Sequence, residues 1–213
     1  MSPDTEYPSW FFARDDPGSD AAFYGQPRFV THIDDAAIKA VGTLYAELGV
    51  DHADARVLDL MSSWVSHLRR APAELVVLGM NVAELDANPM ATERVVHDLN
   101  TDPRLPFADA SFDAVLCCVS IDYLTRPVDV LADVARVLQP GAPVVITFSN
   151  RCFPTKAVHA WLSTDDDGRC ALVAEHLRRA GGFEPAQLSR RTPEGRYRGD
   201  PLFAVVAYRS AQR

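Results

Sequence analysis

The sequence is organised around residues 57–68, which read Val57-Leu58-Asp59-Leu60-Met61-Ser62-Ser63-Trp64-Val65-Ser66-His67-Leu68. The first four residues are typical of a short buried strand that contains an acid. The residues after them predict a tight turn with polar caps that leads into a helix. In α/β proteins this order of strand, turn and helix binds nucleotide-like cofactors at the carboxyl ends of parallel strands. The turn has no glycine, so the main question is whether it can still hold a cofactor.

The composition is that of an ordinary globular domain. The 213 residues are 47% hydrophobic and 23% charged, which suits one domain with a sizeable core. The formal net charge of −8 argues against nucleic acid as a partner, because phosphate binding needs a basic surface. No apolar segment has the length that spans a bilayer, and the N-terminus lacks the pattern of a signal peptide. We therefore expect a cytoplasmic protein without a nucleic-acid or membrane partner, as a monomer or a homodimer.

The cysteines indicate buried, reduced thiols. Cys117 and Cys118 are adjacent in a predicted strand, so their side chains face opposite ways and would not share a metal. Cys152 and Cys170 stand alone, and the sequence has no CxxC pair and no HExxH motif. We expect no metal site.

Strands and helices alternate along most of the chain. Apolar runs predict strands at residues 56–60, 75–79, 94–97, 112–119, 143–149, 183–190 and 202–208. Helical spacing predicts helices at residues 34–48, 81–88, 128–138, 155–162 and 169–180. Continuous apolar strands between amphipathic helices are typical of a parallel sheet covered on both faces. The last two strands have no helix between them, which predicts an antiparallel edge on an α/β, doubly wound, mostly parallel sheet.

We expect one domain over residues 1–213, with a flexible segment at 1–22, a helical cap at 23–50 and an α/β core at 51–213. Residues 1–18 are rich in proline, aspartate and aromatic residues, and disorder or loose packing is the favoured interpretation. The three consecutive aromatic residues Trp10, Phe11 and Phe12 leave a second interpretation open. They would then fold back as a lid or mediate self-association.

Five segments occur in a characteristic order: VLDL at 57–60, LGMNV at 78–82, DL at 98–99, LPFADASFDAV at 105–115 and RVLQPG at 136–141. Together they resemble the motifs of class I S-adenosylmethionine-dependent methyltransferases, and the fourth resembles the signature of the small-molecule branch. The resemblance covers residues 56–149 and implies a Rossmann-like sheet of seven strands. It also implies S-adenosyl-L-methionine as cofactor, S-adenosyl-L-homocysteine as product, and SN2 methyl transfer to a small molecule.

The resemblance implies a set of cofactor-binding residues: Asp59, Ser62, Ser63, Asn81, Val82, Glu84, Asp98, Leu99 and Ser120. Two departures stand out. The usual glycine positions hold Met61, Ser63 and Val65, and a forced positive φ there costs roughly 1 kcal/mol for each residue. Asn81 stands where the family has aspartate, and Glu84 could replace that acid. We expect serine hydroxyls and helix N–H groups to hold the tail of the cofactor.

Methyl transfer needs a positioned acceptor and sometimes a base. The expected catalytic residues are Tyr24, His32 and His67, and the expected substrate contacts are Arg28, Tyr123, Asn150, Arg151 and Lys156. The three cationic residues of that second set would suit an anionic substrate. Other interpretations stay open. The two histidines could pack or cap helices, residues 149–156 could cap a helix, and Trp64 could fill the space left by the glycine turn.

Two further functions compete with methyl transfer. The first is a catalytically inactive methyltransferase-like subunit for binding or regulation, which the glycine-free turn favours. The second is a nicotinamide-binding oxidoreductase, which the absence of a G-x-G-x-x-G turn disfavours.

Overall fold

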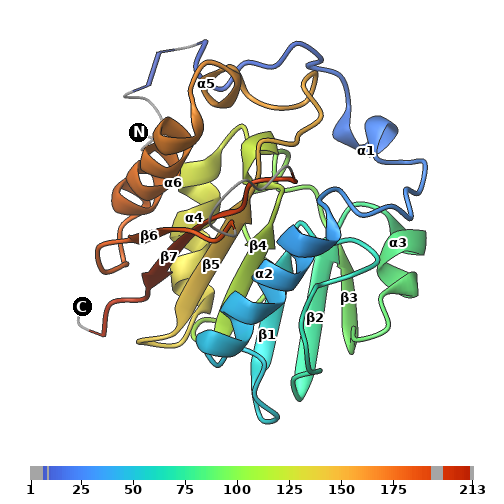
Figure 1. Ribbon diagram of the computed structural model, residues 1–213, viewed down its shortest axis with the longest axis vertical. Coiled ribbons are helices and arrows are strands. Elements are labelled where there is room, and N and C mark those ends of the chain that lie inside the picture. The colour runs from blue at the N-terminus through green and yellow to red at the C-terminus, as the bar shows by residue number, and fades with distance from the viewer. Residues whose placement is uncertain (1–6, 9, 193–198, 212–213) are drawn as a thin grey trace.

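A computed structural model describes residues 7–8, 10–192 and 199–211 of the chain. Its centre is a seven-stranded sheet in the order β3-β2-β1-β4-β5-β7-β6 (Figure 1). The strands are β1 Arg56–Leu60, β2 Glu74–Gly79, β3 Glu93–Val96, β4 Ala114–Cys118, β5 Pro143–Phe148, β6 Gln187–Arg190 and β7 Phe203–Tyr208. The helices are α1 Asp20–Phe23, α2 Asp35–Glu47, α3 Val82–Ala87, the 3-10 helix η2 Ile121–Tyr123, α4 Pro127–Val137, α5 His159–Leu162 and α6 Asp166–Ala180.

Strands β1 to β5 are parallel to one another. Strand β7 pairs antiparallel with both β5 and β6, so one edge of the sheet is antiparallel. The order reverses between β1 and β4, which places a topological switch point at the carboxyl ends of these two strands. The predicted doubly wound, mostly parallel sheet with an antiparallel edge is confirmed.

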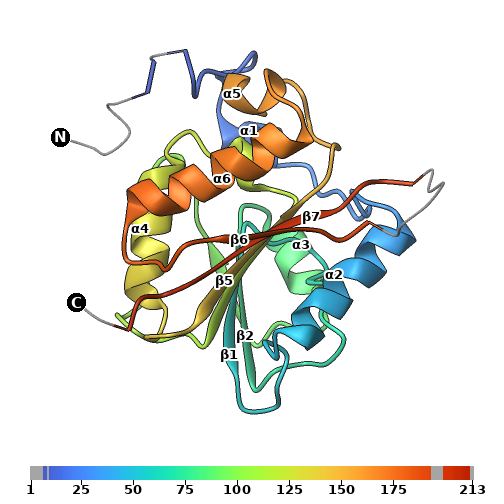
Figure 2. The same cartoon turned by 60° about the vertical axis from the view of Figure 1, so that its left-hand side comes forward.

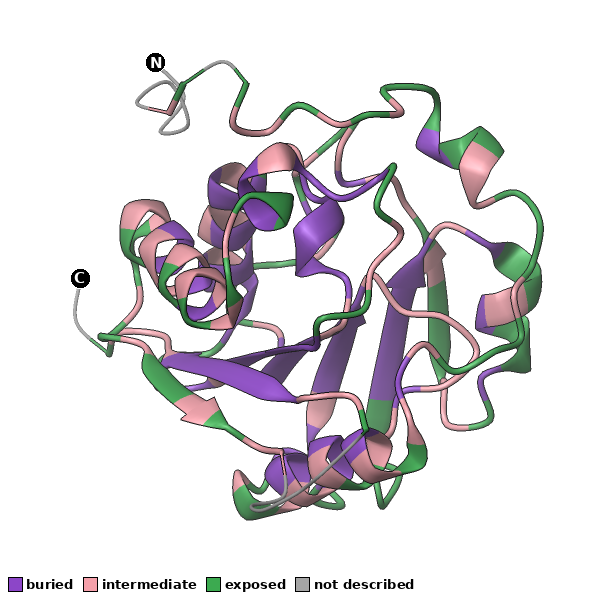
Figure 3. Ribbon diagram, turned by 45° about the horizontal axis from the view of Figure 1, so that its top comes forward, coloured by how far each residue is buried: buried purple, intermediate pink, exposed green. Residues whose placement is uncertain are grey.

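Helices cover both faces of the sheet (Figure 2). Helices α4 and α6 pack on one face through apolar side chains such as Val134 and Val173. Helices α2 and α3 pack on the other face through Val41, Leu44 and Leu85. The central strands between these layers are almost entirely buried (Figure 3). This burial on both sides explains why their sequences are continuous apolar runs.

The helix that we predicted after β1 does not form. Residues 61–73 contain neither helix nor strand. Met61 and His67 both have a φ of 56°, which a right-handed helix does not permit. Side chains and backbone groups of neighbouring elements hold this segment instead, so its amphipathic pattern does not produce a helix.

Two other predicted elements are shorter than expected. The predicted helix at 155–162 is only α5, because Lys156 and Ala157 both donate to the Phe153 carbonyl in a turn and Val158 is extended. The predicted strand at 183–190 is reduced to β6, with an isolated bridge between Phe183 and Arg209 before it.

The described part of the N-terminal segment is packed, which differs from the expected loose terminus. Phe11 and Phe12 lie against the core cluster that contains α4 and α6. The carbonyls of Phe11 and Ala13 accept hydrogen bonds from the backbone N–H groups of Ala160 and His159. The segment therefore runs along α5 and the loop after β5 (Figure 1). Phe11 and Phe12 fold back onto the domain, whereas Trp10 is 52% exposed; residues 1–6 and 9 lie outside the described chain.

Candidate cofactor and substrate cavity

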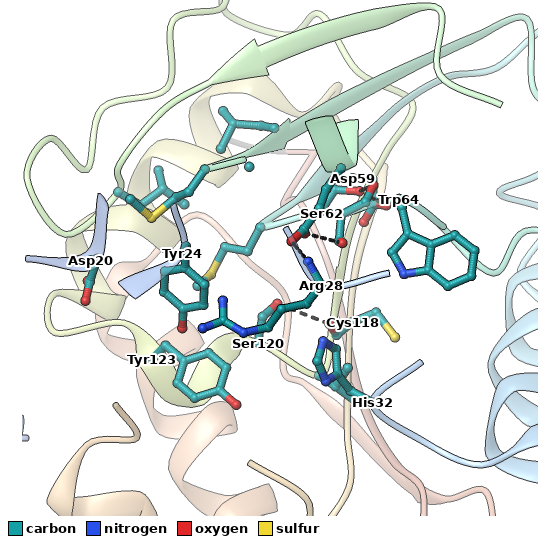
Figure 4. Close-up of a pocket in the computed structure, with 18 of the residues that line it drawn as sticks. Asp20, Tyr24, Arg28, His32, Asp59, Ser62, Trp64, Cys118, Ser120 and Tyr123 are labelled. Carbon is teal, nitrogen blue, oxygen red and sulfur yellow. Dashed lines mark hydrogen bonds between the residues drawn. The ribbon is translucent and has the colours of Figure 1, made fainter. Parts of the chain in front are cut away.

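A large cavity lies at the carboxyl ends of β1, β2 and β4 (Figure 4). Its empty space, including the part open to solvent, is about 1160 Å³. The segment that joins α1 to α2 forms one wall through Tyr24, Arg28, Val30, Thr31 and His32. The remaining walls come from the turns after β1, β2, β3 and β4 and from Phe153 after β5. The cavity therefore occupies the topological switch point of the sheet, where open α/β sheets bind their ligands.

The turn after β1 crosses the end of β2. Ser62 donates its backbone N–H to the Leu78 carbonyl at 2.7 Å. The Ser62 carbonyl lies so close to Gly79 that a Cβ at residue 79 would be 2.3 Å away from it. Glycine at position 79 is thus required by the turn that passes over it. The glycine that makes this crossing possible is on β2, while Met61 on the turn itself has a left-handed backbone.

The hydroxyls of this turn bond to the protein itself. Ser62 Oγ donates to Asp59 Oδ2 at 2.6 Å, and Ser63 Oγ donates to Glu84 Oε2 at 2.5 Å. The amide of Asn88, which is 1% exposed, donates to the Ser63 carbonyl and to Ser66 Oγ. The missing helix corrects the expectation that helix N–H groups hold a cofactor tail, and the two serine hydroxyls bond to Asp59 and Glu84 in this structure. The serines stabilise the turn, and Asn88 is a brace that the sequence interpretation missed.

The residues after β2 hold the N-terminal wall of the cavity. Asn81 Oδ1 caps α3 by accepting the N–H of Glu84, and its amide donates to the carbonyls of Tyr24 and Gly25. Glu84 Oε1 accepts the backbone N–H of Arg28 at 2.7 Å. Asn81 is therefore engaged by the protein at both ends of its amide. Glu84 lines the cavity as a carboxylate, whereas Val82 is 58% exposed and does not line it.

The turn after β3 forms the opposite end of the cavity. Asp98 Oδ1 accepts the N–H groups of Asn100 and Thr101, and its Oδ2 accepts the Thr101 hydroxyl. Leu99 is buried beside it and lines the cavity. Asn100 donates to Asp20 and to the Tyr123 carbonyl, which ties three segments together. The sequence placed Asp98 and Leu99 correctly at the cavity but gave no sign of the part played by Asn100.

Strained backbone marks the junction of β1 and β4. Val119 follows β4 and has a φ of 47°, which is a genuine outlier for a β-branched residue. Met61 follows β1 with a φ of 56°, and both residues line the cavity. Ser120 lies next to Val119 and also lines the cavity. Strained residues of this kind cluster at binding and active sites, where the surrounding structure maintains them.

Asp59 is a buried acid beneath the turn, 3% exposed. Burial raises the pKa of its carboxyl to about 6, although hydrogen bonds from Ser62 and Ser66 oppose the shift. The carboxylate form is therefore the major one at neutral pH. It supplies negative charge close to the strained Met61 without a cationic partner among the described residues.

The three expected catalytic side chains all line the cavity. Burial lowers the pKa of both His32 and His67. Arg28 and Arg151 lower the pKa of His32 further, and His32 lowers that of His67. Both imidazoles are therefore neutral at pH 7. Burial raises the pKa of Tyr24, and its buried hydroxyl has no hydrogen-bond partner. A neutral imidazole can accept a proton, whereas the Tyr24 hydroxyl keeps its proton and can donate a hydrogen bond.

The expected substrate contacts divide into two groups. Arg28 and Tyr123 line the cavity, and Tyr123 is held by a bond from the Phe153 N–H to its hydroxyl. Asn150, Arg151 and Lys156 do not line it. Arg151 is 63% exposed and pairs with Asp200 at 3.5 Å.

Lys156 has a structural role that differs from the expected substrate contact. Its side chain is 0% exposed, and its Nζ lies 3.0 Å from Asp16 and 3.1 Å from Asp20. It also donates to the Gly18 carbonyl, while Arg14 makes a two-oxygen contact with Asp20. This buried ionic cluster fastens the N-terminal segment to the loop after β5. The sequence gave no signal for it, because its partners are far apart along the chain.

Sequence reasoning also missed Asp122. It is 3% exposed, and its Oδ2 has no hydrogen-bond partner. Burial raises the pKa of this carboxyl to about 7. Its position in η2, four residues after the apolar strand β4, was the one available signal. Among the described residues no group of three or more side chains could hold a metal ion, and no helix could cross a membrane.

Comparison with known proteins agrees with this architecture. Residues 62–146 match a family model described as a methyltransferase domain. A ubiquinone/menaquinone biosynthesis C-methyltransferase of Dinoroseobacter shibae is 37% identical over 86 residues, 37% of this chain and 34% of the relative. A demethylmenaquinone methyltransferase of a Mycobacterium species is 36% identical over 118 residues, 52% of this chain and 50% of the relative. The chain thus aligns with about half or less of these curated relatives.

The fold has solved counterparts. The [4+2]-cyclase SpnF superposes with a TM-score of 0.61 at 16% identity, over 90% of this chain and 91% of the cyclase. At that identity the likeness concerns the fold alone. Sheet order, cavity position and matched residues together support one class: the chain resembles the class I S-adenosylmethionine-dependent methyltransferases. Within that class, the model that it matches is the methyltransferase domain over residues 62–146.

The cavity fits the cofactor of this class at both ends. Leu99 and Met80 offer apolar surface for a planar base, and the strained backbone of Met61 and Val119 lies beside open space. Asp59 provides the negative charge that an ammonium group needs. Between the ends, the carboxylate of Glu84 faces the cavity and keeps acceptor capacity beyond its two bonds, since a carboxylate has about four lone-pair sites. Asn81 and Val82 do not line the cavity, and the hydroxyls of Ser62 and Ser63 bond within the protein.

Proposed function

We propose that the protein transfers a methyl group from S-adenosyl-L-methionine directly to a small molecule bound in the cavity at the ends of β1, β2 and β4. The observation that carries the proposal is the pair of strained residues, Met61 and Val119, at the junction of β1 and β4 inside a roofed cavity. The turn that Ser62 and Asn88 brace holds Met61, and the N–H of Val119 bonds to the Thr147 carbonyl on β5. The surrounding structure therefore maintains the shape of this cavity.

When bound, the cofactor supplies an electrophilic methyl group on a sulfonium. The chain has to position the acceptor, exclude water and take up a proton. We assign Leu99 and Asp98 to the adenine, Glu84 to the ribose hydroxyls, and Asp59 with Ser120 to the methionine end. Segment 20–32 covers the cavity, and its Asn81 and Glu84 contacts keep it in place. Exclusion of bulk water strengthens these polar contacts.

His32 is the proposed base, with His67 as the second candidate. The imidazole of His32 lies edge-to-face with Phe153 at a centroid distance of 5.3 Å. Its lowered pKa keeps it neutral at pH 7, so its lone pair is available to an acceptor O–H or N–H. Tyr24 donates a hydrogen bond from its unpartnered hydroxyl and orients the acceptor.

Thermal unfolding with ligands tests the proposal. S-adenosyl-L-homocysteine at 100 times its Kd should stabilise the fold by roughly 2.7 kcal/mol, which is several degrees in Tm. NADH at equal concentration should leave Tm unchanged. Equal curves with and without S-adenosyl-L-homocysteine, together with silent calorimetry, would refute the proposal.

A specific observation supports a second candidate, a domain that binds but does not transfer methyl groups. The hydroxyls of Ser62 and Ser63 and the amide of Asn81 are all engaged within the protein. The same fold in a [4+2]-cyclase also shows that this architecture serves other activities. Binding of S-adenosyl-L-homocysteine without turnover of any of a panel of phenols, amines and carboxylic acids would favour this candidate.

A further inference from the structure

Arg28 is a cation without an ion-pair partner in the part of the chain that the structure describes. Its Nη1 and Nη2 donate to the carbonyls of Gln26 and Phe23, at 3.4 and 2.9 Å. A guanidinium has five N–H donors, so most of its donors remain available. No described carboxylate lies within ion-pair distance of it. A half-buried charge without an opposite charge is costly, and proteins usually resolve that cost with a partner or a ligand.

Neighbouring cations are paired. Arg14 and Lys156 are bonded to Asp20, and Arg151 is paired with Asp200. Among the residues that line the cavity, Arg28 is the one lysine or arginine, and the other charged lining residues are acids. An anionic group that entered this cavity would therefore find one site of opposite charge.

Aromatic rings surround the guanidinium. Its central carbon is 4.7 Å from the ring centre of Phe23, 5.8 Å from that of Tyr24 and 5.5 Å from that of Phe153. Tyr123 is tilted against Phe153 at 6.0 Å. In Figure 4 the guanidinium lies between Tyr24, Tyr123 and Ser120, at the centre of the cavity. Offset and edge-to-face packing against these rings favours a planar aromatic ligand.

The guanidinium of Arg28 lies apart from the part of the cavity that we assign to the cofactor's amino-acid end. The Asp59 carboxylate that we assign to the cofactor ammonium accepts a hydrogen bond from Ser62, and no described hydrogen bond or ion pair joins it to Arg28. Arg28 instead packs against the rings of Tyr24 and Phe153, and Phe153 contacts His32 edge-to-face; we place His32 and Tyr24 beside the acceptor. Phe153, whose ring packs against Arg28, follows β5. Leu99, beside which we place the adenine, follows β3, and β3 and β5 lie on opposite sides of β1 in the strand order.

We infer that Arg28 binds an anionic oxygen of the methyl acceptor, and that the acceptor is a planar aromatic molecule carrying a carboxylate or phenolate. This inference rests on the proposed methyl transfer and names the substrate class of the same cavity. The planar guanidinium can make two parallel bonds to a carboxylate, which would fix the ring in one orientation beside His32. Arg28 is then a residue that determines specificity.

The test uses two probes of equal shape, 2-naphthoate and 2-naphthamide, titrated into the full-length protein by calorimetry with and without S-adenosyl-L-homocysteine. We expect the naphthoate to bind at least tenfold more tightly than the amide. In Arg28→Gln that ratio should fall to about one, and in Arg28→Lys it should be intermediate, because lysine keeps the charge but loses the planar geometry. Arg151→Gln is the matched control and should keep the wild-type ratio, since that side chain does not line the cavity.

Two results would overturn the inference. One is equal affinity of the wild-type protein for both probes, including no binding of either; this comparison does not depend on a variant that folds. The other is weaker binding of S-adenosyl-L-homocysteine to Arg28→Gln with unchanged binding of 5′-methylthioadenosine, which lacks the carboxylate. That result would assign Arg28 to the cofactor. Failure of the proposed function itself is distinct, because the wild-type protein would then not bind S-adenosyl-L-homocysteine.

Discussion

Replacement of Gly79 by alanine tests how the glycine-free turn is held. The new Cβ would lie 2.3 Å from the Ser62 carbonyl oxygen and 3.1 Å from a methyl group of Leu85. A Cβ atom is essentially never found within 3.0 Å of a non-bonded atom. The atom that it would meet belongs to the Ser62 backbone, so the turn has to move by roughly 1 Å. That shift would stretch the 2.7 Å bond from the Ser62 N–H to Leu78.

The magnitude follows from these contacts. Overpacking costs about 1–3 kcal/mol, and a lost hydrogen bond adds about 1 kcal/mol. We expect Gly79→Ala to lower the free energy of unfolding by about 2–4 kcal/mol in urea titrations followed by tryptophan fluorescence. We also expect it to weaken S-adenosyl-L-homocysteine binding, because the same turn carries Met61.

Gly49→Ala is the matched control. Gly49 has a φ of +67°, and an added Cβ meets nothing within 4 Å. That variant should therefore bear only the backbone cost of a left-handed alanine, about 1 kcal/mol, and should bind the ligand normally. If Gly79→Ala costs no more than Gly49→Ala, the turn does not cross β2 as described.

Three further predictions concern ionisable side chains. The raised pKa of Asp122 means that the folded state keeps a proton between roughly pH 4 and 7 that the unfolded state has lost, so stability falls as pH rises through this window. Asp122→Asn should remove that slope. In urea titrations, the difference in free energy of unfolding between variant and wild type should therefore be up to about 4 kcal/mol more favourable to the variant at pH 8 than at pH 4. Lys156→Met should lower the free energy of unfolding by about 3 kcal/mol by leaving Asp20 underpaired, whereas Arg151→Gln should cost about 0.5 kcal/mol or less; equal costs would contradict the buried cluster. Because burial lowers the pKa of His32, kcat/KM should decline only below the usual pH of roughly 6.5 for histidine, and an unchanged acid limb in His32→Gln would exclude this residue as the base.

Local patterns predicted the sheet and most of the helices because each of these elements buries a continuous or periodic apolar surface. The strand at 143–149 is an example, since both of its faces are covered and its residues other than Thr147 and Ser149 are apolar. The helix after β1 was predicted on the same kind of pattern and was wrong. Contacts with Leu78, Glu84 and Asn88 determine that segment, and these residues come later in the chain.

The candidate site was predictable where strand ends converge. Asp59, Asp98 and Ser120 each follow or end a strand, so the topology alone brings them to the cavity. Partner choice was not predictable. Lys156 has the same sequence context as a surface lysine, and only the return of residues 16–20 over the loop after β5 buries it.

A crystal structure with S-adenosyl-L-homocysteine measures most directly whether the glycine-free turn leaves a preformed cofactor site. We predict the adenine beside Leu99 and the homocysteine end beside Asp59 and Val119. The hydrogen bonds from Ser62 to Asp59 and from Ser63 to Glu84 should remain as they are. A ligand elsewhere on the protein, or a turn that refolds so that the serine hydroxyls bond to the ligand, would contradict this account.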